Sequence, residues 1–93
     1  MSVIIHIPTP LRRFTGEQGE IEVQGQTVGD ALRDLTHRHP ALERHLYNEQ
    51  GALRSFVNVF LNDEDVRHLG RDATPLKVGD TLSIIPSIAG GAR

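Results

Sequence analysis

The chain contains no cysteine, and aromatic residues make up only 4% of its 93 positions. Without cysteine it can form no disulfide framework, no thiolate nucleophile and no metal site with cysteine ligands. It also has no block of basic residues, because ten lysines and arginines are balanced by twelve acidic residues, for a formal net charge of −2. Binding of nucleic acid through its phosphates is therefore not expected.

Long apolar runs are missing as well. No run exceeds three residues, and the one at 3–5 ends at His6, so we expect neither a signal peptide nor a membrane-spanning segment. The lack of cysteine is compatible with the cytoplasm, which is the location we expect. A chain of this length forms one domain, and its small core leaves little room for a deep, enclosed active site.

Four segments have the composition or the alternation of β-strands. They are residues 3–7, 20–24, 56–62 and 81–85, and in each of them alternate apolar residues are expected to face the core. Residues 9–19 contain proline and glycine and should form the turn of a wide hairpin. A charged turn at 63–65 is expected to lead into a short return strand at 66–69.

One amphipathic helix is expected to begin at Thr27. Threonine is a good N-cap residue, and Asp30 follows three residues later, near the positive end of the helix dipole. Apolar residues recur at helical spacing at Val28, Ala31, Leu32 and Leu35. The helix should stop near His39, because the residue before Pro40 is disfavoured in the α region. Residues 41–47 are expected to add a further turn or two.

The order of the predicted elements is strand, strand, helix, strand, short strand, strand. Strand pairs on either side of one main helix predict an α+β fold, with a mixed sheet of four to five strands and the helix packed on one face. If the last strand lies beside the first, it runs through the middle of the sheet, which is the β-grasp arrangement found in ubiquitin. We expect this domain to comprise residues 1–86 and a flexible tail to comprise residues 87–93.

The sequence contains no motif for catalysis or metal binding. His37, His39 and His45 lie close together but lack the spacing that places two ligands on one helix face, so no metal site is expected. The acidic run at 63–65 lacks the spacing of a calcium loop. No serine lies in a G-x-S-x-G sequence, so we expect no catalytic residue and a protein that is not itself an enzyme.

Two large apolar residues are predicted on the sheet face that points away from the helix. If residues 57, 59 and 61 face the helix, then Phe60 faces away from it, and the same alternation places Ile85 on the open face. Their strands should be neighbours, so we predict that Phe60 and Ile85 form a docking patch for a partner protein. The alternative is two scattered apolar surface residues, which are common.

The chain ends in Pro86-Ser87-Ile88-Ala89-Gly90-Gly91-Ala92-Arg93. Pro86 lacks a backbone N–H and should end the last strand. The peptide that follows is nearly uncharged and narrows to two glycines, which lack Cβ and let another backbone approach closely. Such a tail can thread into the narrow catalytic site of another protein, with residues Ile88, Ala89, Gly90 and Gly91 inside. The alternative is a frayed terminus.

In these features the chain resembles the ubiquitin-like sulfur carriers of the ThiS/MoaD family. The similarity extends over nearly the whole chain, including the last strand and the Gly-Gly tail. Within the family, the chain is most similar to carriers of the thiocarboxylate route to cysteine. The residues that carry this similarity are Ile7-Pro8-Thr9, Leu11-Arg12, Thr15-Gly16, Phe56-Val57-Asn58 and, above all, Asn62-Asp63-Glu64-Asp65-Val66-Arg67.

The resemblance implies a chemistry for Gly91. Its carboxylate would be adenylated by an ATP-dependent, E1-like activating enzyme and converted to a thiocarboxylate. A sulfur-accepting enzyme would then take the sulfur, namely a cysteine synthase or, in other family members, a thiazole or thiosugar synthase. The chain itself would bind no cofactor, because ATP is used by the activating enzyme.

The chain departs from the family pattern at its end. Family members that are ready for adenylation end at Gly-Gly. Here Ala92 and Arg93 follow, so the carbonyl of Gly91 is part of a peptide bond and its carboxylate is not free. In the family such extensions are removed by a JAMM-type zinc peptidase, so we expect cleavage between Gly91 and Ala92. The same fold also leaves open the small subunit of molybdopterin synthase and a ubiquitin-like modifier that is joined to lysines through Gly91.

Overall fold

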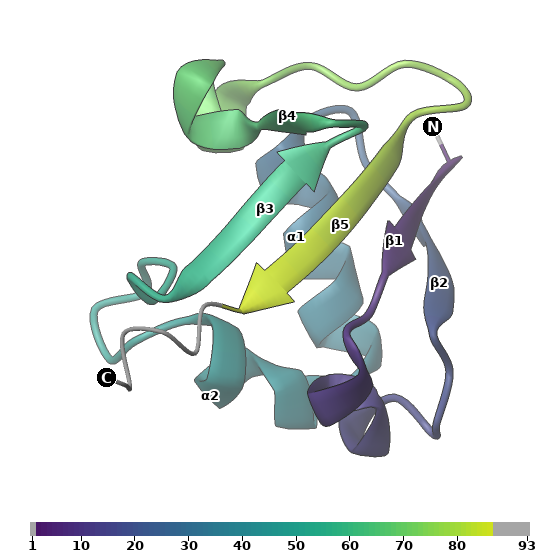
Figure 1. The fold of residues 1–93 in the computed structure, drawn as a ribbon, viewed down its shortest axis with the longest axis vertical. Coiled ribbons are helices and arrows are strands. Elements are labelled where there is room, and N and C mark those ends of the chain that lie inside the picture. The colour runs from purple at the N-terminus through teal and green to yellow at the C-terminus, as the bar shows by residue number, and fades with distance from the viewer. Residues whose placement is uncertain (1, 87–93) are drawn as a thin grey trace.

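The computed structural model describes residues 2–86, in which five strands form one mixed sheet (Figure 1). The strands are β1 (Ser2–His6), β2 (Glu20–Gln24), β3 (Val57–Leu61), β4 (Glu64–Asp65) and β5 (Thr81–Pro86). Their order is β2-β1-β5-β3-β4, so the last strand lies in the middle of the sheet. Strand β5 runs parallel to β1 and antiparallel to β3. The predicted α+β fold of the β-grasp type is confirmed.

The first two strands form the predicted wide hairpin. Their register pairs Val3 with Val23 and Ile5 with Ile21, and all four side chains are buried on the same face. Side chains alternate between the two faces of a strand, so the polar residues between them point outward. The connection contains a 3-10 helix, η1 (Thr9–Phe14), in addition to the expected turn.

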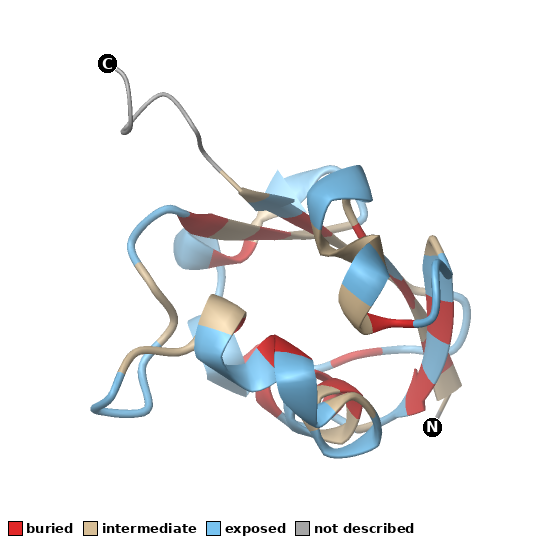
Figure 2. Ribbon diagram, turned by 90° about the horizontal axis from the view of Figure 1, so that it is seen from below, coloured by how far each residue is buried: buried red, intermediate tan, exposed pale blue. Residues whose placement is uncertain are grey.

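Helix α1 (Val28–Arg38) covers one face of the sheet (Figure 1). It begins as predicted, because the Oγ1 of Thr27 accepts a hydrogen bond from the backbone N–H of Asp30 at 3.1 Å. It ends at His39, directly before Pro40. The predicted apolar stripe is buried against the sheet and consists of Val28, Ala31, Leu32 and Leu35. Figure 2 shows the buried positions on both the sheet and α1.

Two short helices close one end of this core. They are the 3-10 helix η2 (Pro40–Leu42) and the helix α2 (Glu43–Leu46), which bury Leu42 and Leu46 completely. They correspond to the further turns that the sequence predicted after α1. A buried leucine removes apolar surface from water that is worth roughly 1.5–3 kcal/mol, so both residues stabilise this end of the domain.

The predicted return strand at residues 66–69 is wrong. The chain reverses already at Asn62, whose φ of 56° is left-handed, and Leu61 pairs with Glu64 in the two-residue strand β4. Asparagine tolerates this conformation better than most residues, which allows the tight reversal. The next residues form the 3-10 helices η3 (Val66–His68) and η4 (Arg71–Ala73) instead. The carboxylate of Asp65 caps η3 by accepting the backbone N–H of Arg67 at 2.9 Å.

The connection that follows contributes to the core. Leu76 lies between η4 and β5, yet only 4% of it is exposed, and its backbone N–H donates to the carbonyl of Gln26 at 2.9 Å. The buried residue fixes this long connection against the start of α1. Within residues 2–86, no helix combines the length and the apolar character needed to cross a membrane.

Candidate functional site on the open face of the sheet

No helix within residues 2–86 covers the face of the sheet opposite α1 (Figure 1). One row of outward residues crosses the sheet in register: Glu20, His6, Ser83, Phe60 and Asp65. The next row on β5 and β3 pairs Ile85 with Asn58. Because side chains alternate, all of these project from the same face. This face is therefore a regular surface on which a partner could dock.

Phe60 and Ile85 lie together on this face, as the sequence predicted. Phe60 is opposite Ser83 and Ile85 is opposite Asn58, which makes Phe60 and Ile85 diagonal neighbours on adjacent strands. Such positions lie about 7–8 Å apart, within reach of an aromatic ring. Ile85 is 47% exposed and Phe60 is partly exposed. The predicted orientation of both side chains is confirmed, and their role in docking stays a prediction.

A polar network borders this apolar pair, and sequence reasoning missed it. The guanidinium of Arg67 contacts Asp65 Oδ2 at 2.8 Å and donates to Asn58 Oδ1 at 2.6 Å. Asn58 Nδ2 donates in turn to the backbone carbonyl of Ile85 at 3.2 Å. The side-chain and backbone hydrogen bonds from Arg67 lower the pKa of Asp65 to about 2. The carboxylate is therefore charged at neutral pH, and the network positions Arg67 beside Phe60.

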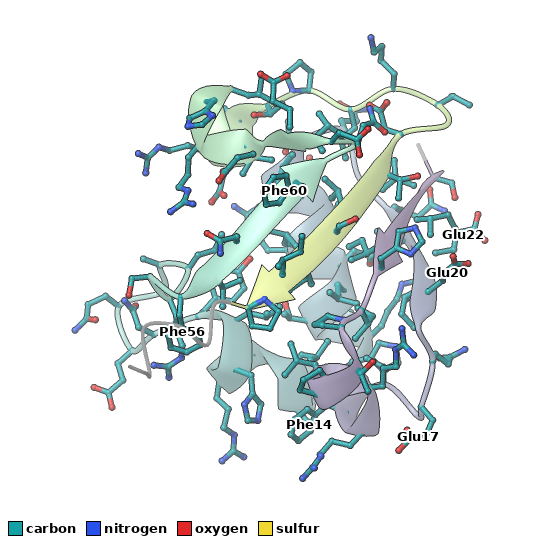
Figure 3. All side chains as sticks on the ribbon, viewed as in Figure 1. Phe14, Glu17, Glu20, Glu22, Phe56 and Phe60 are labelled. Atoms are coloured by element: carbon teal, nitrogen blue, oxygen red, sulfur yellow. The ribbon has the colours of Figure 1, made fainter. Side chains whose placement is uncertain are left out.

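The opposite edge of the face is acidic. Glu20 and Glu22 project from β2, and Figure 3 shows them at the edge of the sheet farthest from Phe56 and Phe60. His6 Nδ1 lies 3.4 Å from Glu20 Oε2, and the hydroxyl of Ser2 donates to Glu22. The apolar pair is thus framed by acidic residues at one edge and by the Asp65–Arg67 pair at the other. A mixed rim of this kind suits a protein interface with an apolar centre.

Pro86 ends the central strand at a position where its missing N–H costs no hydrogen bond to β3. The backbone N–H of Asn62 donates to the backbone carbonyl of Thr81 at 2.7 Å. Counted from this pair, every second residue pair between the antiparallel strands β3 and β5 is hydrogen-bonded. The pair of Val57 with Pro86 falls between these bonds. Residues 81–83 of β5 pair with β1, whereas Pro86, from which the tail continues, pairs with β3. The predicted tail residues Ile88, Ala89, Gly90, Gly91 and Ala92 lie outside the described residues.

The histidines are not gathered around a common point. His45 stacks on Phe14 with ring centroids 4.2 Å apart, and His37 and His39 lie at the end of α1. Among residues 2–86, no group of three or more His, Asp or Glu side chains is arranged to hold a metal ion.

Known proteins are similar to this chain in sequence and in fold. The model of the ThiS family matches residues 5–91. The chain belongs to the ThiS family. It is 40% identical over 93 residues to the sulfur carrier protein CysO of Mycobacterium tuberculosis, which covers 98% of this chain and 100% of that protein. It is also 43% identical over 65 residues to small archaeal modifier protein 3 of Haloferax volcanii, with 70% of each chain covered.

A solved structure is also similar to this chain. One chain of the crystal structure of the Amycolatopsis orientalis BexX/CysO complex superimposes with a TM-score of 0.86 at 43% identity, covering 96% of this chain and 99% of that one. The chain is therefore a homologue of a sulfur carrier protein. In that structure, CysO is in a complex with BexX.

Proposed function

We propose that the protein carries sulfur on Gly91. An ATP-dependent, E1-like enzyme activates the Gly91 carboxylate, whose oxygen attacks the α-phosphorus of ATP and releases pyrophosphate. Sulfide (HS⁻) then attacks the acyl carbon, displaces AMP and, after loss of its proton, leaves a thiocarboxylate. The observation that carries this proposal is the family match, which ends at Gly91. A free carboxylate is a poor acyl donor, and the adenylate supplies the good leaving group that sulfur transfer requires.

The fold supports this role by separating a rigid body from its reactive end. The tail follows β5, the central strand, and residues 87–91 span at most about 18 Å when extended. The partner enzyme can therefore bind the body while the terminal glycines reach into its active site. No side chain of the carrier needs to act in the chemistry, and ATP serves as the cosubstrate of the activating enzyme.

Docking to the activating enzyme is proposed at the open face. Phe60 and Ile85 form the apolar centre, because they are adjacent and project outward from the strands next to the tail. Asp65 and Arg67 form the polar rim at one side. Interfaces of this type concentrate their binding energy in a few aromatic or aliphatic residues surrounded by polar ones.

Ala92 and Arg93 require removal before activation. The adenylated group must be the carboxylate of Gly91, and in the full chain this carbonyl forms the peptide bond to Ala92. A JAMM-type zinc peptidase that cleaves this bond would produce the active form. The cleaved carrier ends in two glycines, which fit a channel too narrow for a side chain.

The acceptor proposed for the sulfur is a cysteine synthase. The identity to CysO of Mycobacterium tuberculosis over the whole chain supports this choice over thiazole, thiosugar or molybdopterin synthesis. The test uses the chain ending at Gly91, loaded with labelled sulfur and mixed with the cysteine synthase encoded in the same genome. Label in cysteine is expected, and a loaded carrier that retains its label with that synthase would exclude this acceptor.

A second candidate function is attachment to other proteins. The identity to small archaeal modifier protein 3 favours it, because the same Gly91 acyl-adenylate can react with a lysine amine instead of a sulfur nucleophile. To distinguish the two functions, an epitope-tagged form of the chain is expressed in the organism that encodes it, and covalent adducts are sought. Tagged species of higher mass that survive denaturation and reducing agent indicate a modifier, whereas their absence together with thiocarboxylate formation indicates a carrier alone.

A further inference from the structure

A pocket lies beside Pro86, the last described residue before the tail. Its walls include apolar residues, Leu11, Phe56 and Pro86, and basic residues, Arg44, His45 and Arg54. These residues come from η1, from α2, from the segment before β3 and from β5, which meet at one end of the sheet (Figure 1). Neither Phe60 nor Ile85 lines the pocket, so it is a surface separate from the docking patch.

Phe56 supplies an exposed aromatic surface at this place. It is 45% exposed. It directly precedes Val57, which pairs with Pro86. Figure 3 shows Phe56 near the end of β5. A partner that takes up the tail passes close to this ring and can cover it, and aromatic rings are enriched at such contacts.

The arginines around the pocket have no acidic partner within the described part of the chain. Arg33, Arg38 and Arg67 each form an ion pair with an aspartate. By contrast, neither Arg44 nor Arg54 forms an ion pair with any carboxylate among residues 2–86. The pocket is thus positive although the net charge of the chain is −2. Charge complementarity favours an acidic occupant.

Two of the basic groups are already held in position. Arg54 Nε donates to the backbone carbonyl of Arg44 at 2.8 Å. His45 stacks on Phe14 at 4.2 Å, and the guanidinium of Arg13 lies 6.0 Å from the centre of that phenyl ring. Side chains that are ordered before binding lose less conformational freedom when a partner binds. The pocket is therefore suited to bind an acidic segment without rearrangement.

We propose that this pocket is a second docking site, which binds an acidic segment of the activating enzyme. The segment places an apolar side chain against Phe56 and Pro86 and a carboxylate near Arg44 and Arg54. Because the pocket adjoins the start of the tail, binding there fixes the direction in which residues 87–91 leave the domain. The inference rests on the proposed function, since it requires an enzyme that takes up the tail.

The test measures ATP–pyrophosphate exchange by the E1-like enzyme of the same genome, with the chain ending at Gly91 as the varied substrate. At low salt, Arg44→Glu and Arg54→Glu should each raise KM about tenfold and leave kcat unchanged, because they weaken encounter and not chemistry. The difference should shrink as NaCl rises to roughly 0.5 M, where surface charges are screened. Phe56→Ala should raise KM at every salt concentration.

Two matched variants separate charge from structure. Arg44→Lys keeps the charge and should stay within about twofold of the original KM. Lys77→Glu makes the same charge change on an exposed residue outside the pocket and should also have little effect. Equal KM values for Arg44→Glu, Arg54→Glu and Lys77→Glu would overturn the second docking site. No exchange with the unsubstituted chain ending at Gly91 would instead overturn the proposed function, and the inference with it.

Discussion

Replacement of Phe60 by alanine separates docking from folding. Phe60 projects from the open face, and its neighbours there are Ser83, Asp65 and the diagonal Ile85. Because the residue is only partly buried and lies outside the core, the loss of its ring should lower the free energy of unfolding by about 1 kcal/mol or less. If it is the centre of the interface, binding should weaken by about 1–3 kcal/mol, or roughly 5- to 150-fold.

The neighbouring residue provides the matched control. Val59 is 2% exposed and points from the same strand into the core. Val59→Ala removes two buried methyl groups and leaves a small cavity, so the free energy of unfolding should fall by about 2–3 kcal/mol. Affinity for the activating enzyme should be unchanged for the fraction that is folded.

The assay combines urea unfolding with isothermal titration of the activating enzyme, using the chain that ends at Gly91. The two variants should show opposite patterns, with Phe60→Ala losing affinity and Val59→Ala losing stability. If Phe60→Ala loses stability and keeps full affinity, the assignment of the open face as the docking surface is wrong.

Three further predictions test individual features of the fold. Thr27→Ala should lower the free energy of unfolding by about 1 kcal/mol in urea, because the N-cap bond is lost, while sulfur loading is retained. Gly25→Ala should cost roughly 1–3 kcal/mol in the same assay, because its Cβ would lie 2.6 Å from the backbone nitrogen of Ala31. An NMR titration of Asp65 should give a pKa of about 2, and Arg67→Ala should raise it toward about 3.9. Because the folded pKa is the lower one, the contribution of Asp65 to stability is present above about pH 4 and is lost as the pH falls through about 2.

Local patterns predicted most of the secondary structure. The alternation at residues 20–24 gave the bounds of β2, and Thr27 and Pro40 marked the two ends of α1. The same alternation placed Phe60 and Ile85 on the open face. These features depend on neighbouring residues, and a single sequence contains that information.

Features that depend on register or on distant segments were missed. Strand β4 has only two residues, too few to show a periodicity, and its position depends on the tight reversal at Asn62. That reversal brings Asp65 opposite Phe60, and only then can Arg67 reach Asn58. Residues 66–69 were therefore predicted to form a strand, whereas residues 66–68 form the 3-10 helix η3, which is capped by Asp65.

The pocket beside Pro86 shows the same limit. Its residues lie more than 70 positions apart in the sequence, from Leu11 to Pro86, and no local pattern connects them. The burial of Leu76 was likewise not predicted, because it depends on contact between a connection and the start of α1. Tertiary packing decides these positions, and it becomes visible once the strand order is known.

The central claim is that Gly91 becomes the sulfur-bearing terminus, and intact-mass spectrometry tests it most directly. The chain ending at Gly91 and the full chain ending at Arg93 are each incubated with ATP, the activating enzyme and a sulfur source. The chain ending at Gly91 should gain the mass difference between sulfur and oxygen. In that form, Gly91→Ala should load poorly, because its Cβ would meet the wall of the enzyme's narrow channel. The full chain should not react, since it presents a bulky, charged arginine in place of glycine. Equal loading of the full chain and the cleaved chain would contradict both the requirement for removal of Ala92 and Arg93 and the proposed role of the terminal glycines.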